Sequence, residues 1–581
     1  MNVQEMDLMN MLKSSGYTNQ RTLSQETGYS LGKVNASIKS LIEKNYLDNM
    51  MSLTDKAEEV FEERKPKHAI ILAAGVGMRM VPINTQVPKG ILEVNGEALI
   101  ERIIRQLQEV QIKDIKIVVG FMKEQYEYLI DKYGVELIYN KEYATKNNMH
   151  SLAMVKEFLE NTYIIPCDIW CKENPFSQNE LYSWYMVAEQ SDEESTIRIN
   201  RKRELQLVDK DEIGNKMIGI AYLCANEISI LRNNVEKMFE NKKYHQCFWE
   251  SAAVQNNKMI FYPKVVSCEK VREINTLEEL RELDEDSNNL NSETLKIAAE
   301  TLKCDVLDIG EIESLKKGMT NRSFRFRYGD KRYIMRIPGE GTDKMINRKQ
   351  EYAVYQVVGS EGICDPICYM SPENGYKITE FLEGARVCDC LDIEDVKKCM
   401  QYLKTVHEKH LQVGHVFDLF EQIEQYESYW MGQPSIYRDY RETKQKVYEL
   451  KKYIDSQEKD WCLTHIDAVP DNFLFVNDEI YLIDWEYSGM QDPHVDVAMF
   501  AIYAMYDRDK VEALIDAYFE NKCPETTRTK IYCYIAVCGM LWSNWCEFKR
   551  ICGVEFGEYS LKQYRYAKEY YKIAKERMDH E

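Results

Sequence analysis

Two short stretches in the last third of the chain contain the residue types that phosphoryl transfer requires. The first, LTHIDAVPDN, contains Asp467 and Asn472, and the second, YLIDWEYSG, contains Asp484. Transfer of a phosphoryl group to an alcohol needs a base beside the attacking hydroxyl and oxygen ligands for magnesium on the phosphates. We therefore predict that Asp467 orients and deprotonates an alcohol, and that Asn472 and Asp484 hold Mg2+.

A pair of tryptophans downstream bears on the acceptor of that phosphoryl group. In MLWSNWCEF, Trp542 and Trp545 are three positions apart, so both project from one face of a helix. Such a stripe is also typical of core packing. If the pair lines a site, its ring faces would attract a cation.

The elements that must position these residues fall into segments with different patterns. Residues 1–66 are helical in period, and residues 67–283 alternate apolar strand-like runs with amphipathic helices, as in a doubly wound α/β domain. The polar run LDEDSNNLNSE predicts a linker at 284–292. In residues 293–581 short strands precede long helices, which fits a bilobal kinase-like domain. The predicted fold class is therefore multidomain α/β and α+β.

Composition limits the class of protein. The 581 residues carry a formal charge of -21, which argues against a protein that coats nucleic acid and favours small substrates, including cationic ones. Seventeen cysteines are scattered without paired CxxC motifs, so we expect reduced thiols. No apolar run approaches the roughly 20 residues that span a bilayer, and the N-terminus lacks the basic start of a signal peptide. We expect a cytoplasmic protein with no membrane partner.

A second phosphate-handling stretch, ILAAGVGMRMVPINTQVPKG, follows a strand near residue 70. The block resembles nucleotidyltransferases that join a nucleoside triphosphate to a phosphorylated small molecule. The resemblance implies a mixed, mainly parallel sheet and a nucleotide loop comprising Ala73, Ala74, Gly75 and Gly77. Glycines allow backbone N–H groups to approach a triphosphate, while Arg79 and Lys89 would offset charge on the α-phosphoryl group and on pyrophosphate.

The magnesium ligands and the acceptor of this domain are predicted from later stretches. Asp168 ends the strand in YIIPCD, and Asn275, in VREINTLEEL, is a second ligand position where related enzymes often carry Asp. The segments around NNMHSLAM and CFWESAAV resemble lic-type bacterial phosphocholine cytidylyltransferases. That resemblance implies that Trp249 and Glu250 face a quaternary ammonium group, and that CTP is the nucleotide.

The C-terminal domain resembles lic-type bacterial choline kinases and, through its catalytic loop, aminoglycoside kinases. KKGMTNRSFRF resembles the nucleotide-covering loop, with Gly318 and Asn321, and YIMRIPG places Arg336 on the strand that carries a basic residue for the ATP phosphates. Glu351 would pair with Arg336, although solvated surface charge is the alternative. The resemblance also implies a trimethylammonium cage built by Trp542, Trp545 and Tyr564. We expect His465 and Asp496 to be structural residues of the catalytic loop.

The N-terminal segment resembles a winged helix-turn-helix of the MarR-like kind. Ser30 is a plausible N-cap of a helix from Leu31 to Lys44. In that family the equivalent helix enters the DNA major groove, which implies the contacts Lys33, Asn35, Ser37 and Lys39. A helical module used for packing or dimerisation is the alternative, because acidic residues offset the basic ones.

Together these features predict a bifunctional enzyme of CDP-choline synthesis. The kinase would make phosphocholine from choline and ATP, and the transferase would join phosphocholine to CTP, with Mg2+ as cofactor of both. Two alternatives stay open: a DNA-binding regulator whose enzyme-like domains sense ligands, and the same chemistries on ethanolamine, another amino alcohol or a sugar phosphate. Neither the oligomeric state nor the final acceptor of phosphocholine follows from the sequence.

Overall fold

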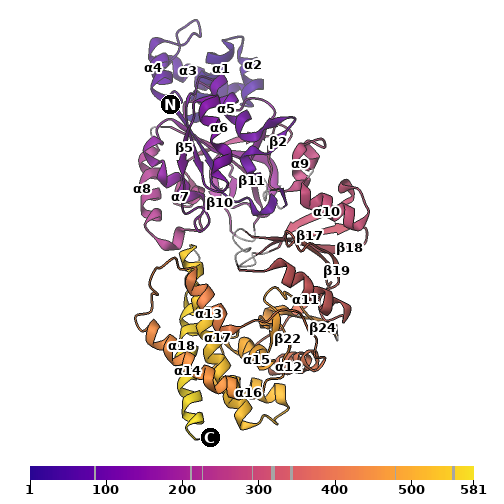
Figure 1. Cartoon of the computed structure of the whole chain (residues 1–581). Helices are drawn as coiled ribbons and strands as arrows, with labels where there is room; N and C mark the ends of the chain where they lie inside the picture. Colours follow the sequence, from indigo (N-terminus) through magenta and orange to yellow (C-terminus); the bar gives the residue numbers. More distant parts are fainter. Residues whose placement is uncertain are drawn as a thin grey trace. The chain divides into compact units, whose positions relative to one another are not determined.

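A computed structural model gives the fold of the chain in two compact units (Figure 1). One unit contains residues 1–297 and 312–314, and the other contains residues 298–311 and 315–581. The described residues are 1–80, 82–83, 87–209, 212–224, 227–290, 292–315, 321–339, 345–477, 479–552 and 556–580. Within them, no helix has both the length and the apolar character needed to cross a membrane. None of the seventeen cysteines, all of which are among the described residues, forms a disulfide.

The first unit begins with a small helical module, α1 (Val3–Ser15), α2 (Gln20–Thr27), α3 (Leu31–Glu43) and α4 (Asp55–Arg64). The Ser30 side chain caps α3 by accepting a hydrogen bond from the Lys33 N–H. An isolated antiparallel bridge joins Leu47 to Leu53 between α3 and α4. The winged-helix assignment itself stays a prediction.

The buried face of α3 corrects one of the predicted DNA contacts. Val34, Ile38 and Leu41 are buried, and Ser37 lies among them with 6% of its surface exposed. Ser37 therefore cannot touch a nucleic acid, because it is three residues from Val34 and shares the inward face of the helix. Lys33, Asn35 and Lys39 are exposed.

The module packs against the α/β part of the same unit. Leu181 joins the module's apolar core, and the Tyr182 hydroxyl donates to Asp7 Oδ1 at 2.6 Å. The Asn161 amide donates to the Glu63 carbonyl at 2.8 Å. Residues 1–66 therefore pack directly against the domain that follows.

The α/β part is built on a mixed sheet with strand order β14-β8-β11-β6-β1-β4-β5 among the described residues. The β1–β4, β1–β6, β4–β5 and β8–β14 pairs are parallel, while β11 is antiparallel to both neighbours. This confirms the predicted mixed, mainly parallel sheet. The strands are β1 (His68–Ala73), β4 (Asp114–Val119), β5 (Glu136–Tyr139), β6 (Thr162–Pro166), β8 (Trp184–Asp192), β11 (Gly214–Leu223) and β14 (Tyr262–Val266).

Helices and short strands complete this part. The helices are α5 (Leu99–Glu109), α6 (Tyr128–Tyr133), α7 (Asn148–Met154), α8 (Ile228–Phe239) and α9 (Leu277–Leu283). Further pairs are β2 (Glu93–Val94) with β3 (Glu97–Ala98), and β7 (Ile169–Cys171) with β15 (Val271–Glu273). A small sheet contains β9 (Ile197–Ile199), β10 (Leu205–Leu207), β13 (Lys258–Met259) and β12 (Val254–Gln255).

The segment predicted as a linker is held by hydrogen bonds over most of its described length. The Asn289 side chain accepts from the Glu93 N–H at 2.8 Å, and Asp284 accepts from the Asn95 N–H at 2.6 Å. The Ser287 hydroxyl donates to the Glu93 carbonyl at 2.8 Å. These polar side chains therefore fold back on the β2–β3 hairpin.

The second unit has a strand-rich part followed by a helical part, as predicted. Its antiparallel strands β17 (Asn321–Tyr328), β18 (Lys331–Pro338), β20 (Lys377–Glu380) and β19 (Ile367–Met370) pair in that order, and α11 (Arg348–Ser360) lies between β18 and β19 in the chain. α10 (Glu293–Leu302) and β16 (Gly310–Ser314) precede them in the chain, and the division into units falls within each of these two elements.

Long helices and short strands form the rest of the second unit. The helices are α12 (Ile393–Glu408), α13 (Leu419–Ser428), α14 (Tyr440–Ser456), α15 (His494–Tyr503), α16 (Arg508–Phe519), α17 (Glu525–Ile551) and α18 (Glu558–Met578). The strands are β21 (Arg386–Val387), β22 (Cys462–Thr464), β23 (Phe473–Val476), β24 (Glu479–Leu482) and β25 (Gly489–Gln491). α17 is buried from Thr529 to Glu547 and forms the centre of this core.

Candidate active sites

In the first unit, the loop after β1 lies at the carboxyl end of a central parallel strand. Ala73 and Ala74 are buried, and Gly75 follows at the exposed start of the loop. Gly77 has a φ of +65°, and a Cβ there would lie 3.2 Å from the Lys89 side chain. Only glycine allows both the positive φ and this close approach without strain. The loop backbone can therefore lie against the Lys89 side chain.

Four predicted residues meet beside this loop. Lys89 forms an ion pair with Asp168, and its Nζ also donates to Asn275 Oδ1 at 2.7 Å. Arg79 Nη2 donates to the same Asn275 oxygen at 2.9 Å. Antiparallel pairing of β15 with β7 brings Asn275 there, since the Ile274 N–H donates to the Asp168 carbonyl at 2.9 Å. The related motif residues Asn84 and Thr85 lie outside the described residues.

The charged residues of this cluster shift one another's pKa values. Burial would lower the pKa of Lys89, but the Asp168 carboxylate outweighs it and the pKa is raised. Burial and the charge of Asp168 raise the pKa of Glu273. Asp168 Oδ1 is buried and has no hydrogen-bond partner among the described residues. An unpaired carboxylate oxygen beside a second carboxylate suits a hard cation held partly by substrate phosphates.

Of the predicted ammonium-facing pair, Trp249 lies in the core and Glu250 is half-buried. Trp249 is 1% exposed and packs with ring centroids 6.0 Å from both Tyr185 and Phe261. Glu250 Oε1 accepts from the Tyr185 hydroxyl at 3.1 Å, while its Oε2 is buried with no partner in the described part of the chain. Burial raises the pKa of Glu250 to about 7. Of the pair, Glu250 is thus the residue with a buried oxygen that can still accept a hydrogen bond or face a cation.

In the second unit, a cavity of about 450 Å³ lies between the strand-rich and helical parts. Seven predicted site residues line it: Asn321, Arg336, Asp467, Asn472, Asp484, Trp542 and Trp545. Glu351 and Tyr564 do not line it, and Gly318 lies outside the described residues. Residues that we did not predict also line it, among them Lys377, Glu486, Tyr487, Met499 and Tyr559.

The catalytic loop is held in a strained conformation by Asp496. Ile466 has a φ of +68°, which is rare for a β-branched residue. Asp496, fully buried on α15, accepts from the Ile466 N–H at 2.7 Å and from the His465 N–H at 2.9 Å. His465 Nε2 lies 2.9 Å from the Ile483 carbonyl. Both residues are therefore structural, as predicted.

Asp467 and Asn472 lie together at the end of this loop. Asn472 Nδ2 donates to the Asp467 carbonyl at 2.9 Å and lies 3.4 Å from its Oδ2. This leaves the Asn472 amide oxygen as the atom to face a ligand. Burial, followed by the charges of Asp484 and Glu486, raises the pKa of Asp467 to about 8. A carboxyl with a raised pKa in a cavity is typical of a functional site.

Arg336 is fixed by a buried ion-pair network. Its Nη1 donates to Glu351 Oε1 at 2.5 Å and its Nη2 to the Gly375 carbonyl at 3.0 Å. Arg348 Nη1 donates to Glu351 Oε2 at 2.9 Å. Glu351 is 1% exposed, so it is not a solvated surface charge. Although burial acts to raise the pKa of Glu351, Arg336 lowers it below the ordinary value.

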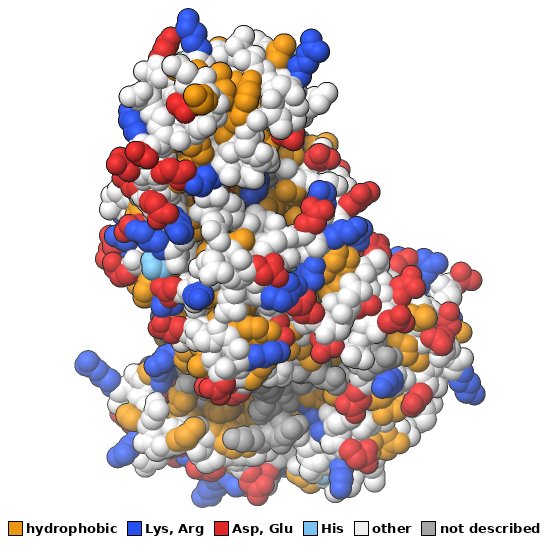
Figure 2. Space-filling model, turned by 90° about the horizontal axis from the view of Figure 1, so that it is seen from above, with side chains coloured by type: hydrophobic (Ala, Val, Ile, Leu, Met, Phe, Trp, Pro, Cys, Tyr) orange, Lys and Arg blue, Asp and Glu red, His pale blue; other side chains and the backbone are white. Residues whose placement is uncertain are grey.

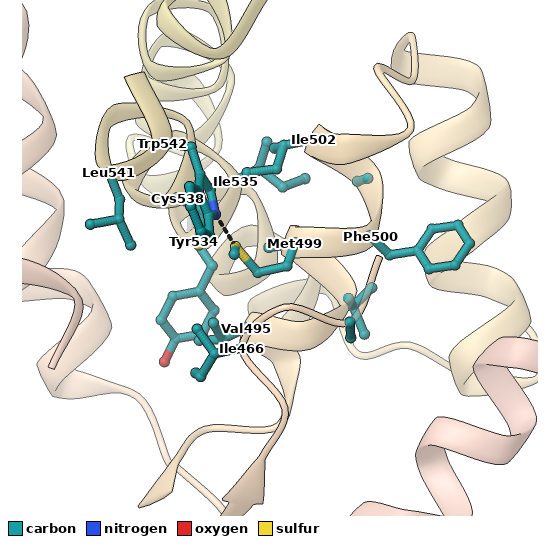
Figure 3. Close-up of a cluster of buried hydrophobic side chains, with 14 of the residues drawn as sticks. Ile466, Val495, Met499, Phe500, Ile502, Tyr534, Ile535, Cys538, Leu541 and Trp542 are labelled. Atoms are coloured by element: carbon teal, nitrogen blue, oxygen red, sulfur yellow. Dashed lines mark hydrogen bonds between the residues drawn. The ribbon is translucent and has the colours of Figure 1, made fainter. Parts of the chain in front are cut away.

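Aromatic side chains from three segments form one end of the cavity. The rings of Trp542 and Trp545 are 5.4 Å apart and nearly perpendicular, and the ring of Tyr487 lies 5.7 Å from Trp542. Trp542 Nε1 donates to Met499 Sδ at 3.2 Å, the contact drawn as a dashed line in Figure 3. Tyr559 on α18 completes the lining.

The structure places Tyr564 outside this aromatic end. Its ring stacks on Tyr437 at 3.8 Å, and its hydroxyl donates to Asp439 Oδ1 at 2.8 Å. Tyr564 is five positions after Tyr559, so the two side chains project from different faces of α18. Tyr487 could have been found from the sequence, because it follows LIDWE directly.

Comparisons with known proteins identify the two domains in which these sites lie. The family described as choline/ethanolamine kinase matches residues 312–537, and the family described as MobA-like NTP transferase domain matches residues 69–203. A choline-phosphate cytidylyltransferase from Streptococcus pneumoniae is 32% identical over 227 residues, which cover 38% of this chain and 99% of that protein. The chain belongs to the choline-phosphate cytidylyltransferase family. It joins this cytidylyltransferase domain to a choline kinase domain.

Two further relatives match the kinase domain. Protein LicA from Haemophilus influenzae is 26% identical over 260 residues, covering 42% of this chain and 76% of that protein. The crystal structure of choline kinase LicA from Streptococcus pneumoniae has 29% identity and a TM-score of 0.43, and covers 48% of this chain and 100% of that chain. The NTP transferase match contains Lys89 and Asp168, and the kinase match contains Asp467, Asn472 and Asp484.

Proposed function

We propose that the kinase domain transfers a phosphoryl group from ATP to choline, and that the cytidylyltransferase domain joins the resulting phosphocholine to CTP. The products of the second reaction are CDP-choline and pyrophosphate. The observation that carries the proposal is a single cavity with Asp467 at its catalytic loop and Trp542, Trp545 and Tyr487 at its aromatic end. An alcohol that carries a quaternary ammonium group fits both features.

In the kinase domain, the aromatic end binds the trimethylammonium group. This group cannot donate a hydrogen bond, so ring faces and nearby negative charge are its favourable surroundings, each ring contributing about 0.5 to 2 kcal/mol. The choline hydroxyl then faces Asp467, which accepts its proton as the oxygen attacks the γ-phosphorus of ATP; the bond from this phosphorus to the β,γ-bridging oxygen breaks and ADP leaves. Positive charge bound in the cavity favours the ionised form of Asp467, whose pKa is raised by burial and then by the neighbouring carboxylates.

The phosphates of ATP are held by residues from both parts of the kinase domain. Arg336 carries a charge fixed in place by Glu351, so it presents a planar donor group to phosphate oxygens. Mg2+ would be held by Asp484 and the Asn472 amide oxygen, and would neutralise charge on the phosphates. The Asn472 contacts with Asp467 keep the base and the metal ligand in fixed relation.

In the cytidylyltransferase domain, a phosphate oxygen of phosphocholine attacks the α-phosphorus of CTP and pyrophosphate leaves. Lys89 and Arg79 offset negative charge on the α-phosphoryl group and on pyrophosphate. Asp168, with Asn275 or Glu273, is the oxygen set that would hold Mg2+. Glu250 supplies negative charge for the trimethylammonium group, with Tyr185 orienting its carboxylate.

The two reactions are consecutive, because the product of the kinase is the substrate of the cytidylyltransferase. A covalent tether keeps the second site near the source of its substrate and raises the effective concentration of phosphocholine. This gives a physical reason for the fusion that does not require channelling. It also makes the two activities separable by substitution in one polypeptide.

Binding of DNA by residues 1–66 remains a further proposal with weaker support. The segment contains eight Lys and Arg residues against ten Asp and Glu residues. In the view of Figure 2, basic and acidic side chains alternate over the visible surface. A DNA-binding face normally concentrates positive charge. The exposed contacts left for this proposal are Lys33, Asn35 and Lys39.

One assay tests the main proposal. The purified chain is incubated with choline, ATP, CTP and Mg2+, and CDP-choline is measured; omission of ATP should stop synthesis unless phosphocholine replaces choline. Omission of CTP should leave phosphocholine as the product. Ethanolamine in place of choline should give a much lower kcat/KM, and an equal value would contradict the aromatic cage. Gel-shift titration with genomic DNA fragments tests the N-terminal module.

A further inference from the structure

A buried hydroxyl supports the backbone next to Asp484. Tyr355 lies on α11 one turn after Glu351 and is 1% exposed. Its Oη accepts hydrogen bonds from the Trp485 N–H at 3.3 Å and from Lys377 Nζ at 2.5 Å. The tyrosine thus joins the helix that carries Glu351 to the residue immediately after Asp484.

The support matters because Asp484 has an unfavourable backbone conformation. Its φ is +66°, in the left-handed region, which costs a non-glycine residue about 1 kcal/mol or more. Such a conformation persists only where neighbouring groups hold it. In the catalytic loop, Asp496 holds Ile466 by accepting from its N–H. The Tyr355 hydroxyl acts in the same way on the N–H that follows Asp484.

Lys377 determines how the hydroxyl is oriented. It lies on β20 directly opposite Arg336 in the register of β18 and β20, lines the cavity, and is 7% exposed. Its Nζ also lies 4.1 Å from the centroid of the Tyr355 ring. A cationic donor on one lone pair of the hydroxyl leaves the other lone pair for the Trp485 N–H.

We infer that Tyr355 and Lys377 are positioning residues of the kinase reaction, which hold Asp484 so that its carboxylate faces the nucleotide phosphates. The inference rests on the proposed kinase function. Neither residue needs to touch choline. Their loss should therefore weaken the binding of metal with nucleotide and leave choline binding nearly unchanged.

The test uses Tyr355→Phe and Lys377→Met in the full chain. Affinity for Mn2+ in the presence of a non-hydrolysable ATP analogue is measured by electron paramagnetic resonance, and the Mg2+ concentration for half-maximal phosphorylation is measured by kinetics. In Tyr355→Phe, the affinity for Mn2+ should fall about tenfold and the Mg2+ concentration for half-maximal phosphorylation should rise about tenfold. This is the size expected for loss of one hydrogen bond to a strained segment. The KM for choline should stay within about twofold. Lys377→Arg should recover most of the loss caused by Lys377→Met, because it restores a cationic donor.

Two controls make the result decisive. Tyr402→Phe removes a hydroxyl that donates to the Ile363 carbonyl at 3.1 Å, away from the cavity lining, and should change nothing. CMP transfer to added phosphocholine reports on the other domain of the same molecule and should also stay constant. Unchanged Mn2+ affinity in both Tyr355→Phe and Lys377→Met would overturn the inference, as would an equal loss of choline affinity. If the wild-type chain fails to phosphorylate choline while the variants still weaken Mn2+ binding, the proposed substrate is wrong and the inference stands.

Discussion

Replacement of Glu250 by Gln should separate the stability of the cytidylyltransferase domain from its affinity for phosphocholine. The Glu250 carboxyl has one oxygen bonded to Tyr185 and one buried oxygen without a described partner. Burial raises its pKa from 4.5 to about 7. Because the folded pKa is raised, the folded form keeps a proton that the unfolded chain loses between these values. The contribution of this proton to the free energy of unfolding is fully present below pH 4.5 and is lost as the pH rises to about 7.

The magnitude follows from the pKa difference. Each pKa unit corresponds to 1.36 kcal/mol, so ionisation of Glu250 in the folded state costs roughly 3 kcal/mol as an upper limit. Solvent reaches part of the side chain, which reduces this figure. Glutamine keeps an oxygen for the Tyr185 hydroxyl and never ionises. At pH 4 the variant and wild type should therefore be about equally stable, whereas at pH 8 the variant should be more stable.

Scanning calorimetry of the full chain measures this difference on the transition that CTP shifts. For a domain of about 200 residues, 3 kcal/mol corresponds to a rise in Tm of roughly 6 to 12 °C. The variant should also lose affinity for phosphocholine, with a KM raised about tenfold, because a neutral amide does not attract the ammonium group. Glu240→Gln, at an exposed position of the same domain, is the matched control.

Two results would refute this reasoning. Equal Tm values for the variant and wild type at pH 8 would show that Glu250 ionises without cost and is not effectively buried. A more stable variant with an unchanged KM for phosphocholine would show that the carboxylate is buried but does not face the substrate. The first result concerns the protonation of the site and the second its role in binding.

Three further predictions concern the other parts of the two sites. Trp545→Ala should raise the KM for choline roughly 2- to 30-fold, from the loss of about 0.5 to 2 kcal/mol of cation–π attraction, while Tyr564→Ala should change it little; steady-state kinetics with varied choline decides. Asp496→Ala should lower the kinase kcat at least tenfold, because nothing then holds Ile466 at positive φ, and a kcat within twofold of wild type would contradict the bracing role. Lys89→Met should reduce CMP transfer at least a hundredfold with phosphocholine formation intact, as followed by pyrophosphate release and by ADP formation.

The chemistry of the two sites was predictable where the residues that perform it are close in the chain. Asp467 and Asn472 lie on one loop, and the separation of Trp542 from Trp545 puts both on one face of α17. The left-handed turn at Gly77 is a local requirement as well. Local geometry allows few arrangements of such residues, so their spacing is informative.

The sequence predicted the alternation of strands and helices, and hence the order of the domains, but not how the segments would pack. The segment at 284–292 has the composition of a linker, yet its side chains hydrogen-bond to the β2–β3 hairpin. Composition measures the average affinity of a segment for water, whereas hydrogen bonds depend on which groups tertiary folding brings within reach.

Contacts between distant residues were decided by the tertiary structure alone. Asn275 meets Lys89 across 186 positions because β15 pairs with β7. Helical periodicity could not tell whether Tyr559 or Tyr564 would face the cavity, since it fixes the angle between side chains and not the rotation of the helix against its neighbours. Family resemblance assigns Trp249 and Ser37 to ligands, and packing buries both side chains. The sequence by itself therefore predicted the two classes of reaction, phosphoryl transfer and nucleotidyl transfer, and the packing of its elements determined which side chains can reach the reactants.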